Sequence, residues 1–531
     1  MSPKLKSYKP TLTVPTEAIY ILKELSERGY QAYIVGGAVR DMLRKETNSN
    51  IEVVDFDFTT NATPEQIIEI FPDGVYENTF GTVIIGEEHI RSLCKLPPRP
   101  TKPPSKSSQR IIDIAKATKI HVSLRQQLEK IASEEQKEAK LLPPFQITTF
   151  RSDGMYTDHR RPESVSWGTS IEEDLSRRDF TINALAISLT NVTLRSNNSS
   201  DSIELTAEEY DVIDNFNGVQ DLLDGVISTV GDPIQRFNED ALRMLRAIRF
   251  AVQLDFRIEP ATLSAIKPLS IHLERISGER IRDEFLKMLV SPHPKRAIEL
   301  MDETGLLKYV IPEILESKNV QQGGHHTTDV WTHSLDAVQH CPSMDPIVRL
   351  ATLLHDVAKP RTKNDQNGKI TFYNHEIVGS RMARDIGQRL KLSRRDIDRL
   401  FILVRRHMFH YIPHNTDAAV RRFMREVGLE NIDDILDLRE GDRLGSGANK
   451  TSWRLEEFKQ RMIEQLHQPM AVTDLAVDGT DIMVALGLSP GPILGTLLQK
   501  LLEEVLENPD LNEKQLLLNR VTQLWADQKT D

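Results

Sequence analysis

Near the N-terminus the hydrophobic pattern predicts a helix, a strand, a second helix and a second strand. Residues 15–28 place apolar side chains at the i, i+3, i+4 and i+7 spacing of an amphipathic helix. The short apolar run 32–35 then stops at Gly36-Gly37, and a helical segment opens directly behind the two glycines. A further apolar run, 51–57, closes on an Asp-x-Asp pair, so we expect a strand that ends at two carboxylates.

Further along, the pattern mixes short strands with helices as far as residue 230 and is then almost purely helical. In the mixed part we expect a helix over 63–71, strands over 82–85 and 145–151, and strand-and-turn patterning over 210–230. In the helical part we expect one amphipathic helix over 231–254 and further helices over 276–289, 455–466 and 492–506. Over 297–314 we expect a helix, a turn at Gly305 and a second helix. The predicted fold class is α+β, a small N-terminal palm with a mixed β-sheet followed by a mostly α-helical remainder.

The segment from about 87 to 144 differs in amino-acid composition from its surroundings. Pro, Lys and Ser are frequent over 97–107, which is typical of an extended or disordered linker, and 111–140 has the pattern of a charged helix. Surface loops accept long insertions at a low cost in free energy, so we interpret this stretch of roughly fifty residues as a peripheral insertion between two strands.

Composition places the chain among ordinary soluble proteins. Its 531 residues exceed what one hydrophobic core serves and suggest about three or four domains. With 39% hydrophobic and 27% charged residues, and with no apolar run near the ~20 residues of a membrane span, we expect no membrane segment. The two cysteines, Cys94 and Cys341, form no disulfide framework, so the expected compartment is the reducing cytoplasm.

The net charge of −11 argues against indiscriminate coating of nucleic acid, because binding to the phosphate backbone works through Lys and Arg. A specific RNA substrate would therefore need basic side chains gathered at one site. The candidates are Arg160-Arg161, Arg177-Arg178 and the helical series Arg243, Arg246 and Arg249.

Asp55 and Asp57 are the first candidates for catalysis. Residues two apart on a strand point to the same face, so the two carboxylates project side by side. Gly36 and Gly37 let backbone N–H groups approach an anion, and Arg40, one turn into the next helix, can reach phosphates. Paired carboxylates hold the Mg²⁺ ions that accompany a nucleoside triphosphate, so the pattern is typical of two-metal phosphoryl transfer.

The order G-G-x-V-R-D followed by D-x-D resembles the active site of the class II tRNA nucleotidyltransferases, the CCA-adding enzymes, and of bacterial poly(A) polymerases. Residues 177–184, RRDFTINA, resemble a second motif of this family, in which Arg178 and Asp179 would contact the bound nucleotide. The loop 154–162 lies where the family has a flexible loop linked to the switch between nucleotides. The resemblance covers most of 30–530 apart from the insertion.

Asp240 and Arg243 are the candidates for choosing the base. They lie three apart on the predicted helix 231–254, where they would be surface neighbours, an arrangement that also suits a simple intrahelical ion pair. Cytosine and adenine both present an amine donor beside a ring-nitrogen acceptor, which a carboxylate and a guanidinium complement, whereas uracil and guanine do not. The sequence E-D-x-x-R resembles the family's base-reading motif, and Arg246 and Arg249 match further nucleotide-binding positions.

Histidines become dense from Gly323 onward and define a second candidate site. Imidazoles and a carboxylate bind transition metals, and an adjacent His-Asp pair can supply two ligands to one ion. The spacing resembles the HD phosphohydrolase domain, whose metal ligands would be His333, His355, Asp356 and Asp442, with His375 and His407 serving a second ion or the substrate. In the family such domains are linked to 2′,3′-cyclic phosphodiesterase and phosphatase activities. Metal binding is therefore expected, with hydrolysis at tRNA ends as a further hypothesis and a purely structural role as its alternative.

Together these patterns predict an enzyme with four regions. Residues 1–230 would form a nucleotidyltransferase head, 231–322 a nucleotide-selecting helical neck, 323–450 the HD domain and 451–531 a helical tail. The expected reaction is template-independent addition of C, C and A to the 3′ end of tRNA from CTP and ATP, with release of pyrophosphate. The expected cofactors are Mg²⁺ at the paired aspartates and a divalent transition metal at the HD site.

Three alternatives remain open. A poly(A) polymerase shares the catalytic motifs, although the basic run that such enzymes carry after the strand following the aspartates is replaced here by Gly86-Glu87-Glu88. Enzymes that add only CC or only A share the motif residues. From a different class, the chain could be an HD phosphohydrolase whose first domain senses nucleotide.

Overall fold

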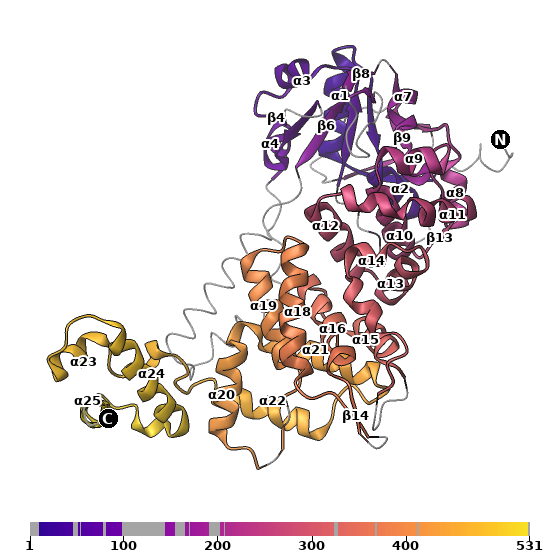
Figure 1. Ribbon diagram of the computed structural model, residues 1–531. Helices are drawn as coiled ribbons and strands as arrows, with labels where there is room; N and C mark the ends of the chain where they lie inside the picture. Colours follow the sequence, from indigo (N-terminus) through magenta and orange to yellow (C-terminus); the bar gives the residue numbers. More distant parts are fainter. Residues whose placement is uncertain are drawn as a thin grey trace. The chain divides into compact units, whose positions relative to one another are not determined.

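The computed structural model describes residues 10–45, 51, 53, 55–77, 81–97, 144–153, 165–168, 170–190, 202–206, 208–322, 328–366, 369–409, 411–412 and 414–528. These residues divide into two compact units. The head unit comprises the described residues up to 315 together with 389–392, and the helical unit comprises the others (Figure 1). Most of the predicted insertion, the loop 154–162 and Arg160-Arg161 lie outside the described residues.

A seven-stranded mixed sheet forms the centre of the head unit. Its strands, in spatial order, are β11 (Tyr210–Asp214), β9 (Leu185–Leu189), β2 (Ala32–Val35), β3 (Asp57–Thr60), β6 (Phe145–Thr149), β5 (Thr82–Ile85) and β4 (Val75–Glu77). Every neighbouring pair is antiparallel except β3 with β6. The parallel pair joins two halves of the sheet, and the predicted mixed palm is confirmed.

Helices and short strand pairs surround this sheet. The helices are α1 (Thr16–Glu27), α2 (Gly37–Lys45), α3 (Pro64–Ile70), α4 (Glu87–Leu93), α7 (Ile171–Ser176) and α8 (Gly218–Asp224). The pairs are β1 (Leu12–Pro15) with β10 (Ser202–Leu205), β7 (Arg151–Asp153) with β8 (Val165–Trp167), and β12 (Val226–Ile227) with β13 (Arg257–Ile258). A buried core of Val35, Phe150, Leu175 and Ala186 packs α7 against the sheet.

The two candidate aspartates lie at the start of a strand and not, as predicted, at the end of one. Strand β3 begins at Asp57, which pairs with Val35 of β2 and with Gln146 of β6, and Asp55 precedes it. Gly36, at φ +73°, turns the chain away immediately after Val35. A strand before Asp57 would therefore have no partner in β2, because backbone N–H and C=O groups need one to extend the ladder.

The rest of the head unit is helical. Its helices are α9 (Pro233–Glu239), α10 (Leu242–Leu254), α11 (Pro260–Leu269), α12 (Gly278–Leu289), α13 (Pro294–Glu303) and α14 (Leu307–Val310). The prediction of one helix over 231–254 is wrong, because Asp240 has extended backbone angles of φ −143° and ψ 107°. Its side chain instead accepts a hydrogen bond from the N–H of Leu242, as an N-cap residue does, so a new helix begins there.

The helical unit consists almost entirely of helices. They are α15 (Val330–His340), α16 (Pro346–Leu354), α17 (Lys359–Thr362), α18 (His375–Arg389), α19 (Arg394–Arg406), α20 (Asp417–Val427), α21 (Ile432–Gly445), α22 (Trp453–Gln465), α23 (Gly479–Leu486), α24 (Pro492–Glu507) and α25 (Lys514–Gln528). A hairpin of β14 (Asn364–Gln366) and β15 (Lys369–Thr371) precedes α18. The predicted helices at 455–466 and 492–506 are confirmed. Within the part of the chain described here, no helix is long and apolar enough to cross a membrane.

Candidate functional site

The glycine turn between β2 and α2 brings two guanidinium groups against the backbone. A side-chain carbon at Gly36 would lie 3.0 Å from Nη1 of Arg178, and one at Gly37 would lie 3.5 Å from Nη2 of Arg40. Gly36 also holds a positive φ that other residues adopt only with strain. The missing side chain at Gly36 therefore serves both the turn and the close approach of Arg178, whereas a side-chain carbon at Gly37 would meet Arg40 at an ordinary contact distance.

Asp55 and Asp57 lie beside this turn and influence each other. Burial and the nearby charge of Asp55 raise the pKa of Asp57 to about 6, while Arg178 opposes the shift. Asp55 itself is exposed to solvent. Two carboxylates that repel each other at the edge of a half-buried site form a donor set that suits a hard divalent cation, since the ion would relieve the repulsion.

Arg178 is held in place by a fully buried carboxylate. Its Nη2 lies 3.2 Å from Oδ2 of Asp174, which also binds Arg177. Although burial acts in the opposite direction, the two guanidinium groups hold the pKa of Asp174 below its usual value. The Nε of Arg178 is buried and has no hydrogen-bond partner among the described residues, which leaves a donor for a bound anion.

Arg40 is almost buried and already has partners. Its Nη1 donates to Oδ1 of Asn183 at 2.9 Å, and its Nε and Nη2 donate to the Asp41 carboxylate. Its guanidinium carbon lies 5.3 Å from the centroid of the Phe250 ring. Arg40 thus lies at the glycine turn as expected, with part of its hydrogen-bonding capacity directed into the protein.

Asp179 anchors a series of arginines on α10. Its Oδ1 accepts from the backbone N–H of Phe180, and its Oδ2 accepts from Nε of Arg246 at 2.7 Å. Burial alone would raise the pKa of Asp179, but Arg246 and Arg243 lower it to about 2. Asp179 is therefore a fixed negative charge that orients the Arg246 guanidinium.

Glu284 of α12 completes this network. Its Oε2 lies 2.7 Å from Nε of Arg249, and its Oε1 lies 3.6 Å from Nη1 of Arg246. The Arg249 guanidinium also stacks 4.2 Å from the Phe250 ring centroid. Burial lowers the pKa of Arg249 to about 10, so the residue is still charged at neutral pH.

Asp240 and Arg243 lie close in sequence but form ion pairs with other residues. Asp240 uses Oδ2 to bind Nη2 of Arg280 at 2.7 Å, and Arg243 uses Nη1 to bind Oε2 of Glu239 at 2.6 Å. Arg243 also donates from Nη2 to the carbonyl of Arg177, in the second motif. The alternative of a simple intrahelical ion pair is wrong, because Asp240 lies in the extended link between two helices.

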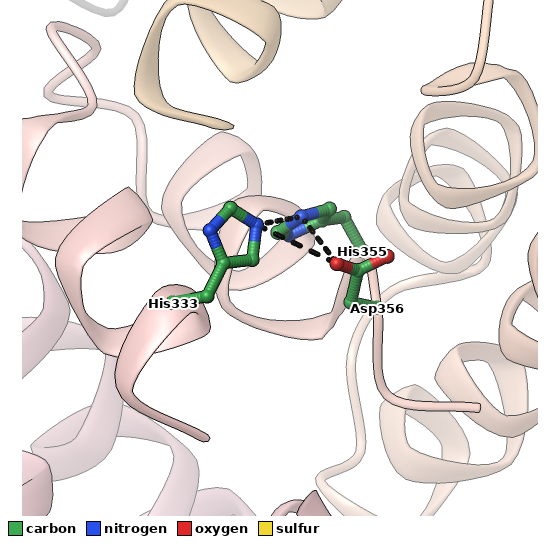
Figure 2. A group of neighbouring side chains, drawn as sticks. All are labelled: His333, His355 and Asp356. Carbon is green, nitrogen blue, oxygen red and sulfur yellow. Dashed lines mark hydrogen bonds and ion pairs between the residues drawn. The ribbon is translucent and has the colours of Figure 1, made fainter. Parts of the chain in front are cut away.

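The second candidate site lies in the helical unit, where His333 of α15 meets the adjacent pair His355-Asp356 at the end of α16 (Figure 2). The two imidazole Nε2 atoms are 3.0 Å apart, and each lies within 3.5 Å of Oδ2 of Asp356. Asp442 of α21 adds its Oδ1 at 3.2 Å from the same atom of His333. All four predicted ligands therefore converge on one point.

The other oxygen of Asp356 faces a second pair of imidazoles. Its Oδ1 lies 3.3 Å from Nε2 of His375 and 3.7 Å from Nε2 of His407, and these two nitrogens are 3.3 Å apart. All these side chains except Asp442 are nearly inaccessible to solvent. Asp356 thus stands between two histidine pairs and could bridge two ions.

Local structure orients the rings. The Nδ1 atoms of His355, His375 and His407 each lie 2.7 Å from the carbonyl oxygen three residues earlier, which turns every Nε2 inward. Gly441 and Gly445, four apart on α21, let α15 pack so closely that a side-chain carbon at either would lie within 2.7 Å of its backbone. This close packing brings His333 to Asp442.

Charge in this cluster is strongly coupled. Burial would lower the pKa of His355, but Asp356 and Asp442 raise it to about 10. The pKa of Asp356 is held well below its usual range, against burial, by His355 and by Lys359, whose Nζ lies 2.7 Å away. Inward-facing imidazoles with two buried carboxylates form the donor set of a divalent transition metal.

Several contributors were not singled out from the sequence. Arg280 and Glu284 act through ion pairs with residues far away in the sequence, whereas Asp174 and Lys359 act through neighbours within four residues, Arg178 and Asp356. The spacing of Arg280 and Glu284, four apart on an amphipathic helix, was the available signal that both belong to one helix face.

Family models match three regions of the chain. The model described as "Poly A polymerase head domain" matches residues 32–93 and 103–228. The model described as "Probable RNA and SrmB-binding site of polymerase A" matches 255–317, and the one described as "tRNA nucleotidyltransferase domain 2 putative" matches 378–521. The first of these covers the glycine turn, both aspartates and the Arg178-Asp179 motif.

Curated relatives and solved structures agree with these matches. An A-adding tRNA nucleotidyltransferase from Deinococcus radiodurans is 34% identical over 350 residues, which cover 63% of this chain and 75% of that protein. A CCA-adding enzyme from Ligilactobacillus salivarius is 28% identical over 514 residues, or 96% of each chain. The fold is similar to that of a Bacillus stearothermophilus CCA-adding enzyme in complex with CTP, with a TM-score of 0.60 and 24% identity over the full length of both chains. The chain is thus a nucleotidyltransferase and belongs to the family that comprises the CCA-adding and A-adding tRNA nucleotidyltransferases and the poly(A) polymerases.

Proposed function

We propose that the head unit adds C, C and A to the 3′ end of tRNA, using CTP and ATP and releasing pyrophosphate. The observation that carries this proposal is that Arg178 lies against the glycine turn at Gly36 beside Asp57, which pairs with Val35 just before the turn and is influenced by the charge of Asp55. Asp55 and Asp57 would hold Mg²⁺, which when bound supplies the charge that activates the RNA hydroxyl and stabilises the triphosphate.

The protein's own groups would bind and orient the nucleotide. Arg178 offers a buried Nε–H to a phosphate oxygen, while Asp174 fixes its orientation. Asp179 holds the Arg246 guanidinium at the same motif. Arg40 keeps the glycine turn rigid through Asn183 and adds positive charge close to the turn.

Base choice would fall to Asp240 and Arg243. The carboxylate would accept from the exocyclic amine of C or A, and the guanidinium would donate to the ring nitrogen. Uracil and guanine present a carbonyl and a ring N–H there, which would leave unpaired polar groups.

Full CCA addition is supported by CCA-adding relatives that this chain matches along nearly their whole length. CCA-adding enzymes from Ligilactobacillus salivarius, Anoxybacillus flavithermus and Enterococcus faecalis match over 95–96% of their length, the A-adding enzyme from Deinococcus radiodurans over 75% and a CCA-adding enzyme from Lactobacillus helveticus over 57%. The proposal is tested with tRNA that lacks its end, ends in C or ends in CC, supplied with single labelled triphosphates and Mg²⁺. Addition that stops after C, C and A supports it. Unlimited A tracts would indicate a poly(A) polymerase, and addition of only CC or only A a partial enzyme.

We propose a second activity for the helical unit, metal-dependent phosphoester hydrolysis by an HD domain. The convergence of His333, His355, Asp356 and Asp442 supports it. A divalent transition metal at this set, when bound, supplies a Lewis acid for a phosphate oxygen. Lys359 would neutralise charge on Asp356, and the buried His375 and His407 would orient the other carboxylate oxygen.

Metal binding and hydrolysis can be tested separately. Calorimetric titration of the metal-free chain with Mn²⁺ or Ni²⁺ should show binding, and His355→Ala should abolish it. Hydrolysis of a nucleoside 2′,3′-cyclic phosphate should fall with the same variant and persist in Asp55→Ala. If the wild-type protein binds no ion, the cluster is structural and the second activity is refuted.

A further inference from the structure

Helix α12 carries two opposite charges, four residues apart, toward the nucleotide-binding groups. Arg280 lies one turn before Glu284, and the helix packs along α10. Arg280 binds Asp240, while Glu284 binds Arg249 and approaches Arg246, the partner of Asp179. One face of α12 therefore contacts both Asp240, which is proposed to read the base, and the two arginines of α10 that lie next to Asp179.

The carboxylate of Asp240 has few other restraints. Oδ1 accepts from the N–H of Leu242 at 3.0 Å, which fixes one oxygen at the start of α10. The backbone of Asp240 is extended and lies outside both flanking helices, so helical hydrogen bonds do not define the side-chain direction. The 2.7 Å bond from Nη2 of Arg280 is what fixes Oδ2.

A fixed carboxylate matters because of the chemistry of the wrong bases. Uracil and guanine carry a ring N–H beside a carbonyl, so a carboxylate that could shift by one ring position would accept from that N–H. A carboxylate held in one place meets only the exocyclic amine of C or A. Discrimination therefore requires restraint as well as charge.

We propose that Arg280 is a positioning residue for base selection, which holds Asp240 in the orientation that accepts an amine and refuses a ring N–H. This proposal rests on the base-reading role proposed for Asp240. The side chains of Arg280 and Asp240 are 32% and 17% exposed, so the pair borders solvent and remains accessible to a nucleotide. We assign the pair a role in geometry, because Arg280 fixes the direction of the Asp240 carboxylate.

The test compares two arginines of the same helix. Arg280→Ala removes the restraint, and Arg280→Lys keeps the charge but loses the planar fork. Arg282→Ala is the matched control, because Arg282 binds Asp283 and the carbonyl of Lys391 instead. For each variant, kcat and KM are measured with CTP, ATP, UTP and GTP on tRNA lacking its end, together with the melting temperature.

Arg280→Ala should lower the preference for CTP over UTP about tenfold, because an Asp240 carboxylate that is free to move by a fraction of an ångström would no longer position the base accurately. Arg280→Lys should restore part of the preference, and Arg282→Ala should retain it. A uniform loss with all four nucleotides would mean that the pair is merely structural and would overturn the proposal. If Arg280→Ala does not fold, Arg280→Lys and Arg280→Gln are compared instead. An unchanged preference for CTP over UTP in both of these variants would also overturn the proposal.

Asp240→Ala separates this proposal from the one on which it rests. If Asp240→Ala loses discrimination while the Arg280 variants keep it, base reading stands and the role of Arg280 is refuted. If Asp240→Ala keeps discrimination, the base-reading proposal fails, and the role of Arg280 fails with it.

Discussion

Replacing Gly36 by alanine should damage nucleotide addition far more than it damages the fold. Gly36 has φ +73°, and an L-residue in this left-handed region costs roughly 1–2 kcal/mol. The new side-chain carbon would also lie 3.0 Å from Nη1 of Arg178, against an ordinary contact of about 3.5–4.0 Å. The guanidinium must therefore give way by a few tenths of an ångström, which should disturb its 3.2 Å contact with Asp174.

Gly29 supplies the control, because it separates backbone strain from crowding. It has φ +84° in the same unit, and a side-chain carbon there would meet nothing within 4 Å. Gly36→Ala and Gly29→Ala should thus lose similar unfolding free energies, about 1 kcal/mol each in urea denaturation. Only Gly36→Ala should lower kcat/KM for CTP, by about tenfold, because misplaced groups lose transition-state contacts steeply.

A double-mutant comparison makes the reasoning refutable. If the damage runs through Arg178, adding Gly36→Ala to an Arg178→Ala protein should cost little further activity. Two results would refute the argument: equal activities for Gly36→Ala and Gly29→Ala, or full additivity of Gly36→Ala with Arg178→Ala. Either would mean that the contact between turn and guanidinium has no part in catalysis.

Three further predictions concern stability. Burial and neighbouring carboxylates raise the pKa of Asp437 to about 6 from 3.8, so the folded chain binds more protons than the unfolded chain between those values and loses stability as pH rises through them. Asp437→Asn should therefore add about 1 kcal/mol to the unfolding free energy at pH 8, after allowance for solvent screening, and nothing at pH 4, as measured by urea denaturation. Glu17→Gln should lower the unfolding free energy by about 3 kcal/mol, because it removes the buried carboxylate that pairs with the buried Arg91; a loss below 1 kcal/mol would contradict this. Gly441→Ala should lower the unfolding free energy by about 2 kcal/mol and weaken Mn²⁺ binding, because the new side-chain carbon would force α15 away. Gly495→Ala in α24 is the control: its side-chain carbon would have no neighbour within 4 Å, so the melting temperature should be no lower than that of the wild type.

The features that the sequence predicted well are those with short-range causes. A strand, two glycines and a helix follow from local preference, and the adjacent His355-Asp356 pair pointed to the cluster in which both side chains meet His333. The mixed sheet and the mostly helical remainder followed from the hydrophobic pattern, which mixes short apolar runs with helices up to residue 230 and has helical spacing beyond it. The convergence of the remaining histidines then required only that their helices pack together.

The features that were missed depend on contacts between distant segments. The chain has 78 acidic residues, and no local pattern selects Asp240 as the partner of Arg280 or Glu284 as that of Arg249. The break at Asp240 did carry a local signal, since Asp before a helical run is a strong N-cap residue. The apolar periodicity of 231–254 outweighed it, because the two helices continue nearly the same spacing of buried side chains.

The register of the sheet gives the insertion a new significance. Asp57 lies beside Gln146 of β6, which in turn lies beside Ile84 of β5, so all three share one row across the sheet. The chain leaves the sheet after Ile85 of β5, two strand spacings or about 10 Å from β3, and re-enters it at Phe145 of β6, the strand that directly neighbours β3. Any sequence inserted between those two points, whether by evolution or by protein engineering, would be anchored at the end of the sheet where β3 begins with Asp57.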